Sequence, residues 1–386
     1  MLDYRLDEEH EALRKTVERF AREVVAPNAA AYDEAKRFPY DIVAQMAEMG
    51  LFGLPFPEEY GGMGGDYFAL CLAIEELARA DSSTAITLEA GVSLGAMPVY
   101  RFGTEEQRRE WLPTLTSGES LGAFGLTEPG GGSDASATRT RAVLSDGEWV
   151  LNGTKCFITN SGTDISRLVT VTAVTGEAPD AGKEISTFLV PIPRDGFTVA
   201  PPYSKVGWHA SDTRELTLQD VRVPEENLLG ERGRGYANFL SILDEGRIAI
   251  AALSVGLAQA CVDESVAYAK ERQAFGHPIG DFQSISFKIA DMEMRTQTAR
   301  LAYYRAAEKM LRGERFKKEA AIAKLHASEA AVTNAREATQ VHGGYGFMNE
   351  FAVARHWRDS KILEIGEGTS EVQRMLIARG LGLPVE

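Results

Sequence analysis

The order of helical and strand-like segments along the chain constrains its fold more than any other feature. Apolar residues recur at helical spacing up to about residue 118, short strand patterns fill residues 119–230, and long helical patterns return from residue 231. With 386 residues, the chain is too long for one small core and long enough for two or three domains. We therefore expect an α+β protein with three domains, at residues 1–118, 119–230 and 231–386.

The N-terminal third predicts three helices. The first carries an apolar stripe with steps of four, three and four residues, at Leu13, Val17, Phe20 and Val24. Asp7 can cap this helix, and Pro27 is expected to follow its end. A second stripe covers residues 42–49 and closes at Gly50, and a third covers residues 67–77.

The middle of the chain predicts a small antiparallel β domain. Asn152-Gly153 separates two strand-like runs, and an Asn-Gly pair is the strongest short signal for a β-hairpin turn. Further strand-like runs cover residues 168–174, 187–190 and 216–223. The last part predicts long helices over residues 236–275, 282–311 and 316–341, with Met292 and Met294 in the core.

Charge and cysteine content exclude several functional classes. The net charge of −15 argues against a nucleic-acid surface, which needs clustered Lys and Arg. The three cysteines, Cys71, Cys156 and Cys261, are far apart and lack metal-binding spacing. We therefore expect buried, reduced thiols, and neither a disulfide framework nor a metal site.

The N-terminus and the hydropathy of the chain bear on its location. Residues 1–10 are rich in acidic side chains and lack the apolar segment of a signal peptide and the Arg-rich pattern of a transit peptide. No run reaches the about 18 apolar residues that a transmembrane helix needs. We expect a cytoplasmic protein that does not span a membrane.

The stretch from Ile365 to Arg374 places a carboxylate between two residues without side chains, Gly366-Glu367-Gly368. Glycine permits strained dihedrals and close approach of a ligand. Thr369 or Ser370 can cap a helix that follows over residues 372–378. Glu367 is therefore well placed to act on a bound molecule, although a solvated glutamate in a loop remains the alternative from these residues alone.

A second candidate is the loop that contains Gly130-Gly131-Gly132. Three consecutive glycines free backbone N–H groups to face a ligand, often an anion, and Thr127 and Ser133 add hydroxyl groups. A flexible surface loop is the alternative interpretation.

Six motifs occur in one order along nearly the whole chain. They are Thr127-Glu128-Pro129 with Gly132-Ser133-Asp134, Ile158-Thr159-Asn160, Ser211-Asp212-Thr213-Arg214, Arg272-Gln273-Ala274-Phe275-Gly276, Gln340-Val341-His342-Gly343-Gly344-Tyr345-Gly346 and Glu367-Gly368-Thr369-Ser370. In this order they resemble the acyl-CoA dehydrogenase family, and in particular its bacterial short- and branched-chain members. The resemblance implies an N-terminal helical domain, a middle antiparallel β domain and a C-terminal four-helix bundle.

The resemblance also implies FAD, which fits the chemistry because no amino-acid side chain accepts a hydride. Matching positions place one group on the flavin from the middle domain: Phe124, Leu126, Thr127, Ser133, Phe157 and Thr159. A second group matches residues that contact FAD from an adjoining subunit: Arg272, Phe275, Gln283, Gln340, Gly343 and Gly344. Thr369 and Glu371 complete the predicted FAD contacts. Many relatives carry Trp where this chain has Phe157.

Glu367 matches the catalytic base of the family, which removes the α-proton of an acyl thioester while the β-hydrogen leaves as hydride. Its backbone N–H, together with a ribityl hydroxyl of FAD, would then stabilise the charge on the thioester oxygen. Burial by acyl chain and flavin is expected to raise the pKa of this base. A second location of the base in some relatives matches Gly246, which cannot act, and the adjacent Glu245 points about 100° away on a helix.

The predicted substrate contacts are Ser133, Asp244, Arg247 and Gly368, again by resemblance. From the residues alone, Asp244 and Arg247 are three apart on a helix and predict a local ion pair. Many relatives carry Tyr directly before the base, where this chain has Gly366. We therefore expect a preference for short acyl chains, including α-branched ones; the alternative is that Gly366 only relaxes the backbone and a neighbouring side chain fills the space.

The function that the resemblance implies is oxidation of an acyl-CoA to the 2,3-enoyl-CoA by a homotetramer, in fatty acid or branched-chain amino acid catabolism. Electrons would pass to an electron-transfer flavoprotein. Three alternatives stay open: an acyl-CoA oxidase, a dehydrogenase of a carrier-protein-bound acyl group, and a non-catalytic flavin-binding protein. Oxidase relatives are usually longer than 386 residues, and the intact Glu367 argues against a dead site.

Overall fold

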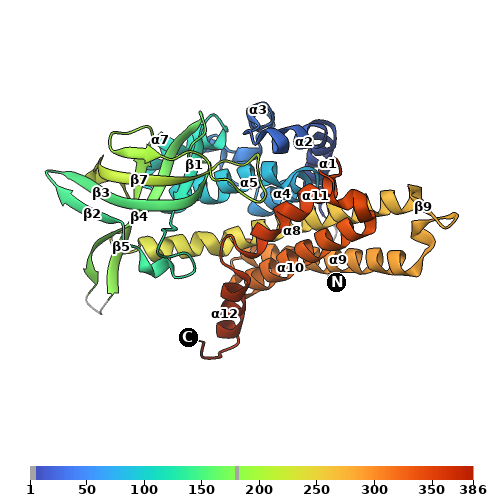
Figure 1. Cartoon of the computed structure of the whole chain (residues 1–386). Coiled ribbons are helices and arrows are strands. Elements are labelled where there is room, and N and C mark those ends of the chain that lie inside the picture. Colours follow the sequence, from blue (N-terminus) through green and yellow to red (C-terminus); the bar gives the residue numbers. More distant parts are fainter. Residues whose placement is uncertain (1–5, 179–181, 386) are drawn as a thin grey trace.

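A computed structural model describes residues 6–178 and 182–385 of the chain. The strands of the large sheet gather at one end of the molecule, the N-terminal helices lie beside them, and the long C-terminal helices extend to the other end (Figure 1). The expectation about the N-terminal ten residues rests partly on residues 1–5, which lie outside the described part. No described helix is long and apolar enough to cross a membrane.

Helices form the first part of the chain. They are α1 (Glu8–Phe20), a π-helical turn (Ala21–Val25), α2 (Ala26–Ala35), α3 (Tyr40–Glu48), α4 (Tyr67–Ala80), α5 (Ser82–Glu89), a second π-helical segment (Ala90–Ala96), α6 (Met97–Phe102) and α7 (Glu105–Thr116). Asp7 caps α1 as predicted, because its side chain accepts a hydrogen bond from the backbone N–H of His10. Gly50 follows α3 with φ 73°, as a helix end in the left-handed region requires.

The sequence prediction that Pro27 follows the end of the first helical segment is wrong. The chain stays helical through the π-helical turn and into α2, where Pro27 occupies the first turn. Proline is tolerated there because that turn does not need its missing N–H group. The wider π-helical turn makes the new start possible without a loop.

One eight-stranded sheet forms the middle of the chain. Its strands are β1 (Leu121–Gly125), β2 (Arg141–Ser145), β3 (Glu148–Thr159), β4 (Ser166–Ala178), β5 (Gly182–Pro191), β6 (Phe197–Val199), β7 (Thr213–Pro224) and β8 (Leu228–Leu229). Their order is β6-β7-β3-β2-β4-β5-β8, with β1 on β4. The β1–β4 and β2–β4 pairs are parallel, so the sheet is mixed rather than wholly antiparallel as predicted.

The predicted hairpin at Asn152-Gly153 is also wrong. Both residues lie inside the single strand β3, and the turn falls instead at Asp146-Gly147, between β2 and β3. Asn152 and Gly153 form an irregularity in the pairing with β7, where the Asn152 side chain exchanges two hydrogen bonds with Asp220. A Cβ at Gly153 would lie 2.3 Å from Oγ1 of Thr140, so glycine serves close packing here.

Long helices form the last part of the chain. They are α8 (Gly235–Glu271), α9 (Gln283–Leu311), α10 (Lys317–His342), α11 (Ala352–Ser360) and α12 (Ser370–Gly380), with a small hairpin of β9 (Gln273–Ala274) and β10 (His277–Pro278) between α8 and α9. Helix α8 packs against α10, α9 and the N-terminal α4. The fold is that of three successive parts, helical, β and helical, as the sequence order predicted.

The apolar core falls into two clusters. One joins the N-terminal and C-terminal helices and includes Phe52, Leu70 and Leu253, and the other lies within the sheet. All three cysteines are buried, as predicted. Met292 is fully buried, but Met294 is 58% exposed, so its predicted place in the core is wrong.

Asp359 on α11 joins the three parts of the chain. Its buried carboxylate accepts a hydrogen bond from the backbone N–H of Trp208 at 2.6 Å and another from Oγ of Ser82 at 2.9 Å. Trp208 lies on a loop of the middle part, and Ser82 begins α5. This junction fixes the β part against both helical parts and thereby sets the relative positions of the site residues described below.

Candidate active site

Glu367 lies in a strained turn directly before α12. Its φ is 52°, in the left-handed region that a glutamate rarely adopts, and Gly368 follows with φ 93°. Thr369 then caps α12 by accepting a hydrogen bond from the N–H of Val372 at 3.3 Å. The turn leaves the backbone N–H of Glu367 without a hydrogen-bond acceptor among the described residues.

Two side chains from different elements hold this turn. Nζ of Lys324, on α10, donates to the carbonyl oxygen of Gly368 at 2.8 Å, and Nε2 of Gln373 donates to the same oxygen at 2.8 Å. Lys324 is 0% exposed, and burial lowers its pKa to about 8. The sequence reasoning missed both residues. A charge inside the apolar run from Ala320 to Leu325 was the available signal for Lys324.

Gly246 on α8 makes room for the Glu367 carboxyl group. A Cβ at this position would lie 2.4 Å from Oε2 of Glu367, so the helix backbone and the carboxyl group approach each other closely. The adjacent Glu245 forms an ion pair with Arg101 at 2.9 Å. The position of the alternative base is therefore filled by the carboxyl group of Glu367 itself, and Glu245 is engaged elsewhere.

Glu367 is half-buried as a residue, its carboxyl oxygen Oε2 is fully buried, and this burial raises the pKa of the carboxyl group. Lys324 and Arg247 oppose that shift through their positive charges. A second carboxyl group, of Glu89 at the end of α5, lies beside it and is 0% exposed. The sequence reasoning missed Glu89, whose only local signal is an acidic residue inside the apolar run from Ala85 to Ala90.

Asp244 and Arg247 form the ion pair that their spacing predicted. Arg247 is buried and Asp244 half-buried, and Nζ of Lys317 lies 3.5 Å from the Asp244 carboxylate. The two residues lie on α8 within three positions of Gly246. Their predicted contact with substrate stays a prediction.

The glycine-rich loop is anchored by a buried ion pair. Nζ of Lys155 on β3 donates to Glu128 at 2.8 Å and to the carbonyl oxygen of Leu126 at 3.2 Å. The Glu128 carboxylate also accepts hydrogen bonds from the N–H groups of Arg139 and Thr140, at 2.7 and 3.0 Å. Lys155, which the sequence reasoning missed, therefore ties the start of this loop to the sheet, and Glu128 joins the start of the loop to its end.

The first predicted cofactor group surrounds this loop. Phe157 is 66% exposed with φ 61°, and Phe124 stacks on Phe239 of α8 with ring centroids 3.9 Å apart. Leu126 is buried, Thr127 and Thr159 are half-buried, and Ser133 is exposed. An exposed aromatic ring held in a strained conformation next to accessible hydroxyl groups suits a flat heteroaromatic ligand.

The second predicted cofactor group lines a cavity of about 740 Å³ at the junction of α8, α9 and α10. Arg272, Phe275, Gly343 and Gly344 all contribute to its wall. Phe275 is 94% exposed, and the Arg272 guanidinium lies 5.7 Å from the Tyr345 ring centre without an ion pair among the described residues. Gln283 and Gln340 are exposed next to this wall, at the start of α9 and near the end of α10.

The two groups lie at opposite ends of one subunit, because the β9 hairpin and the sheet are at the two extremes of the molecule (Figure 1). Thr369 and Glu371, also predicted to contact FAD, lie at a third place, on the first turn of α12. One chain therefore does not bring all the predicted cofactor contacts together. The predicted sharing of the cofactor between neighbouring subunits would account for this separation.

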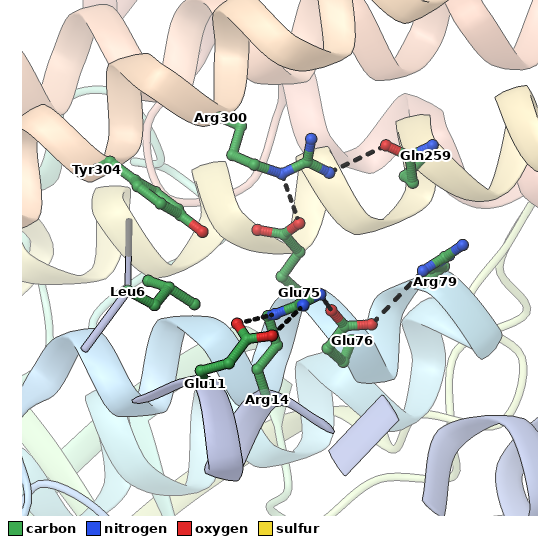
Figure 2. Close-up of a pocket in the computed structure, with 9 residues that line it drawn as sticks. All are labelled: Leu6, Glu11, Arg14, Glu75, Glu76, Arg79, Gln259, Arg300 and Tyr304. Carbon is green, nitrogen blue, oxygen red and sulfur yellow. Dashed lines mark hydrogen bonds and ion pairs between the residues drawn. The ribbon is translucent and has the colours of Figure 1, made fainter. Parts of the chain in front are cut away.

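A separate polar pocket of about 360 Å³ lies between α1, α4, α8 and α9 (Figure 2). Its charged groups pair with one another: Glu75 accepts from Nε of Arg300 at 2.8 Å, and Arg14 contacts Glu11 at 3.0 Å and Glu76 at 3.2 Å. These ion pairs match the charged side chains of the pocket with one another. We therefore interpret the pocket as a set of ion pairs that holds α1 against the other helices, and not as a ligand site.

The described residues contain no cluster of three or more His, Cys, Asp or Glu side chains able to hold a metal ion. A buried carboxylate in a fixed turn can accept a proton, and a free backbone N–H beside it can stabilise a developing oxyanion.

Comparison with known proteins gives matches over nearly the whole chain. Residues 7–119, 123–221 and 233–382 match the N-terminal, middle and C-terminal domains of acyl-CoA dehydrogenase. The probable acyl-CoA dehydrogenase YngJ of Bacillus subtilis (strain 168) is 50% identical over 380 residues, which cover 98% of this chain and 100% of the relative.

Solved structures agree with these matches. Butyryl-CoA dehydrogenase from Megasphaera elsdenii superposes with a TM-score of 0.94 at 42% identity, covering 98% of this chain and 100% of that one. A structure described as the electron transferring flavoprotein of Acidaminococcus fermentans, in a study of flavin-based electron bifurcation, gives a TM-score of 0.95 at 40% identity, covering 98% and 99% of the two chains. The chain belongs to the acyl-CoA dehydrogenase family.

Proposed function

We propose that this protein is an FAD-dependent enzyme that oxidises short-chain or α-branched acyl-CoA thioesters to 2,3-enoyl-CoA, with Glu367 as the base. The observation that carries the proposal is the buried Glu367 carboxyl group, set in a strained turn that Lys324 and Gln373 hold from two sides. The similarity to butyryl-CoA dehydrogenase supports a short acyl chain.

FAD, when bound, would accept the β-hydrogen of the substrate as hydride. The residues of this chain supply the rest of the reaction. Glu367 would take the α-proton, and its free backbone N–H would donate to the thioester oxygen as negative charge develops there. Because the turn is already formed, these two groups need no reorganisation when substrate enters.

The residues present fit FAD. The Arg272 guanidinium, which forms no ion pair with the residues that the structure describes, suits a pyrophosphate, because its planar fork matches phosphate oxygens. A Cβ at either Gly343 or Gly344 would meet no atom within 4 Å, so the approach to this cavity is open. Phe157 offers an exposed ring face for the flavin end.

The first test is an assay of purified protein with a panel of acyl-CoA thioesters and an artificial electron acceptor. We expect a yellow protein whose flavin absorbance is bleached anaerobically by a short acyl-CoA. Rapid peroxide formation in air would support the oxidase alternative, and turnover of only carrier-bound thioesters would support the biosynthetic one. A flavin that no thioester bleaches would contradict the proposal and favour a non-catalytic protein.

The same proposal includes a homotetramer that completes its cofactor sites between subunits. Helix α9 exposes Phe287, Met294 and Leu301, which lie seven residues apart and so share one face of the helix. An apolar helix face of this kind needs a partner. A second copy of the chain could cover it and bring Arg272 of one subunit to a flavin held by another.

Arg272→Ala is therefore expected to weaken both FAD retention and assembly. FAD that binds only to the assembled protein stabilises the assembly by mass action. Loss of one FAD contact should therefore lower both the affinity for FAD and the stability of the assembly. Flavin content after gel filtration and sedimentation velocity would measure the two effects, with Arg222→Ala on the exposed face of β7 as a matched control. A variant monomer that retains FAD stoichiometrically would contradict the shared site.

Electron transfer to an electron-transfer flavoprotein is the proposed next step. The similarity to a structure that concerns such a flavoprotein supports this partner. Reduction of a purified electron-transfer flavoprotein, dependent on acyl-CoA and on this protein, would test it.

Gly366 is proposed to favour α-branched chains, and Gly366→Tyr tests that role. A Cβ at Gly366 would meet only Ile362, at 3.5 Å or more, so the backbone tolerates a side chain there. The bulky ring should then lower kcat/KM for isobutyryl-CoA more than for butyryl-CoA, by roughly 10- to 200-fold in the ratio, which is the usual weight of one methyl group. An equal loss for both substrates, or a wild-type preference for long straight chains, would refute this role.

A further inference from the structure

Glu89 is a buried acid that the proposed reaction does not use. Its side chain is 0% exposed, and neither carboxyl oxygen accepts a hydrogen bond from a donor within the described parts of the chain. An ionised carboxylate without a partner is costly to bury, so such a group takes up a proton. Unlike the other buried acids of the helical core, Glu89 lies beside the proposed base.

The geometry brings the two carboxyl groups to one point of α8. A Cβ at Gly246 would lie 2.4 Å from Oε2 of Glu367 and 3.8 Å from Oε1 of Glu89. Because Gly246 has no side chain, nothing from α8 separates the two groups. Both carboxyl groups therefore face the same point of the α8 backbone, and the pKa of each responds to the presence of the other.

The charged and titratable groups around the two carboxyl groups favour the protonated, neutral form of Glu89 and the ionised form of Glu367. Burial raises the pKa of Glu89 well above its usual range, and the negative charge of Glu367 raises it further. On the Glu367 side, the cations Lys324 and Arg247 lower the pKa of the base. The other groups near the pair, which carry no positive charge, are Tyr67 and Cys71 on α4, Ser93 on the second π-helical segment and Glu245 on α8.

We propose that Glu89 is a positioning residue which holds a proton against the Glu367 carboxylate, so that the two acids together carry one negative charge. The proposal deepens the function proposed above and rests on it for its catalytic consequence. The α-proton of the substrate goes to Glu367, and Glu89 keeps its own proton throughout. The pair is then neutral after the transfer, beside an apolar acyl chain.

This arrangement predicts a distinct pH dependence. Protonation of Glu367 removes the base on the acid side. On the alkaline side, Glu89 has a raised pKa, so it is neutral below that value and ionises as the pH rises through it. Two adjacent negative charges in the acyl site then disfavour substrate binding, and kcat/KM should fall because KM rises.

Three variants separate these effects. Glu89→Gln keeps a donor for Glu367 but cannot ionise, and it should abolish the alkaline fall in kcat/KM. Glu89→Leu removes the donor, and it should move the acid limb upward by about one pH unit, the usual weight of a hydrogen bond to a charged group. Glu76→Gln is the matched control, because Glu76 is another buried acid, with a pKa raised to about 7, remote from Glu367 in the pocket of Figure 2.

A measurement without turnover keeps the inference separate from the proposed function. Above pH 8, where Glu76 with its pKa of about 7 is largely ionised, infrared difference spectra of the wild-type holoenzyme minus Glu89→Gln should contain the band of a protonated carboxylic acid, and those of the wild type minus Glu76→Gln should not. If this band is absent, or if Glu89→Gln retains the alkaline fall, the inference is overturned. Inactivity of the wild type on every acyl thioester, with the band present, would refute the proposed function and leave the proton on Glu89 established.

Discussion

Glu367→Gln is expected to lower kcat by about 10²–10⁴-fold, the usual contribution of a general base. The amide has the size of the carboxyl group but does not accept the α-proton. The turn should survive, because Lys324 and Gln373 bind the Gly368 carbonyl oxygen and not the Glu367 side chain. FAD content should therefore stay at the wild-type level while turnover nearly disappears.

The same variant should not lose stability at neutral pH. Burial raises the pKa of Glu367 in the folded state, so the folded protein binds this proton more tightly than the unfolded chain. Such a group reduces stability at pH values above its unfolded pKa, and glutamine removes that penalty. The expected combination is therefore a thermal midpoint equal to or above that of the wild type and almost no activity.

The control for this experiment is Glu364→Gln. Glu364 lies three residues earlier, and its carboxylate pairs with Lys361 on the surface. The Glu364→Gln variant should have turnover and flavin content near the wild-type values. If Glu367→Gln keeps most of the wild-type rate on a good substrate, the base lies elsewhere in the site and the assignment is wrong.

Local sequence signals predicted helices and caps well and failed where distant contacts decide. The Asp7 cap, the Gly50 end of α3 and the Thr369 start of α12 are properties of a few neighbouring residues. Asn152-Gly153 carries a strong local turn signal, yet it lies in a strand, because Asp220 and Thr140 fix both residues from across the sheet. Long-range packing overrides local preference at such positions.

In the candidate site too, features set by neighbouring residues were predicted and features set by distant contacts were missed. The stretch around Glu367 was visible in the sequence because glycines flank the acid, and in the structure one carboxyl oxygen of this acid is buried and its turn is held by two hydrogen bonds. Glu89, Lys324 and Lys155 were missed, because each is one charged residue in an otherwise regular strand or helix. Only the fold brings Glu89 and Lys324 to the same carboxyl group, and it does so from helices more than 200 residues apart in the chain.

Lys324→Met should lower kcat by about 10²-fold, because a misplacement of about 1 Å at the reacting groups has that effect. Methionine fills a similar volume but donates no hydrogen bond, so the Gly368 carbonyl oxygen keeps only Gln373. The turn that presents Glu367 is then held from one side. The loss of the Lys324 charge should also raise the pKa of Glu367, and the acid limb of the kcat/KM profile should move to higher pH.

The thermal midpoint of Lys324→Met distinguishes a role of Lys324 in positioning the base from a role in stabilising the fold. Burial lowers the pKa of Lys324 to about 8 in the folded state. The charged side chain therefore reduces the free energy of unfolding at neutral pH. This loss of stability disappears only as the pH rises above the pKa of the lysine in the unfolded chain. Lys324→Met removes the buried charge, so its thermal midpoint at pH 7 should be close to that of the wild type despite the lost activity. Lys324→Gln, which keeps a donor, should recover part of the rate, and Lys318→Met on the same helix should change neither quantity. Full activity with an unshifted pH profile in Lys324→Met would show that Gln373 alone positions the base.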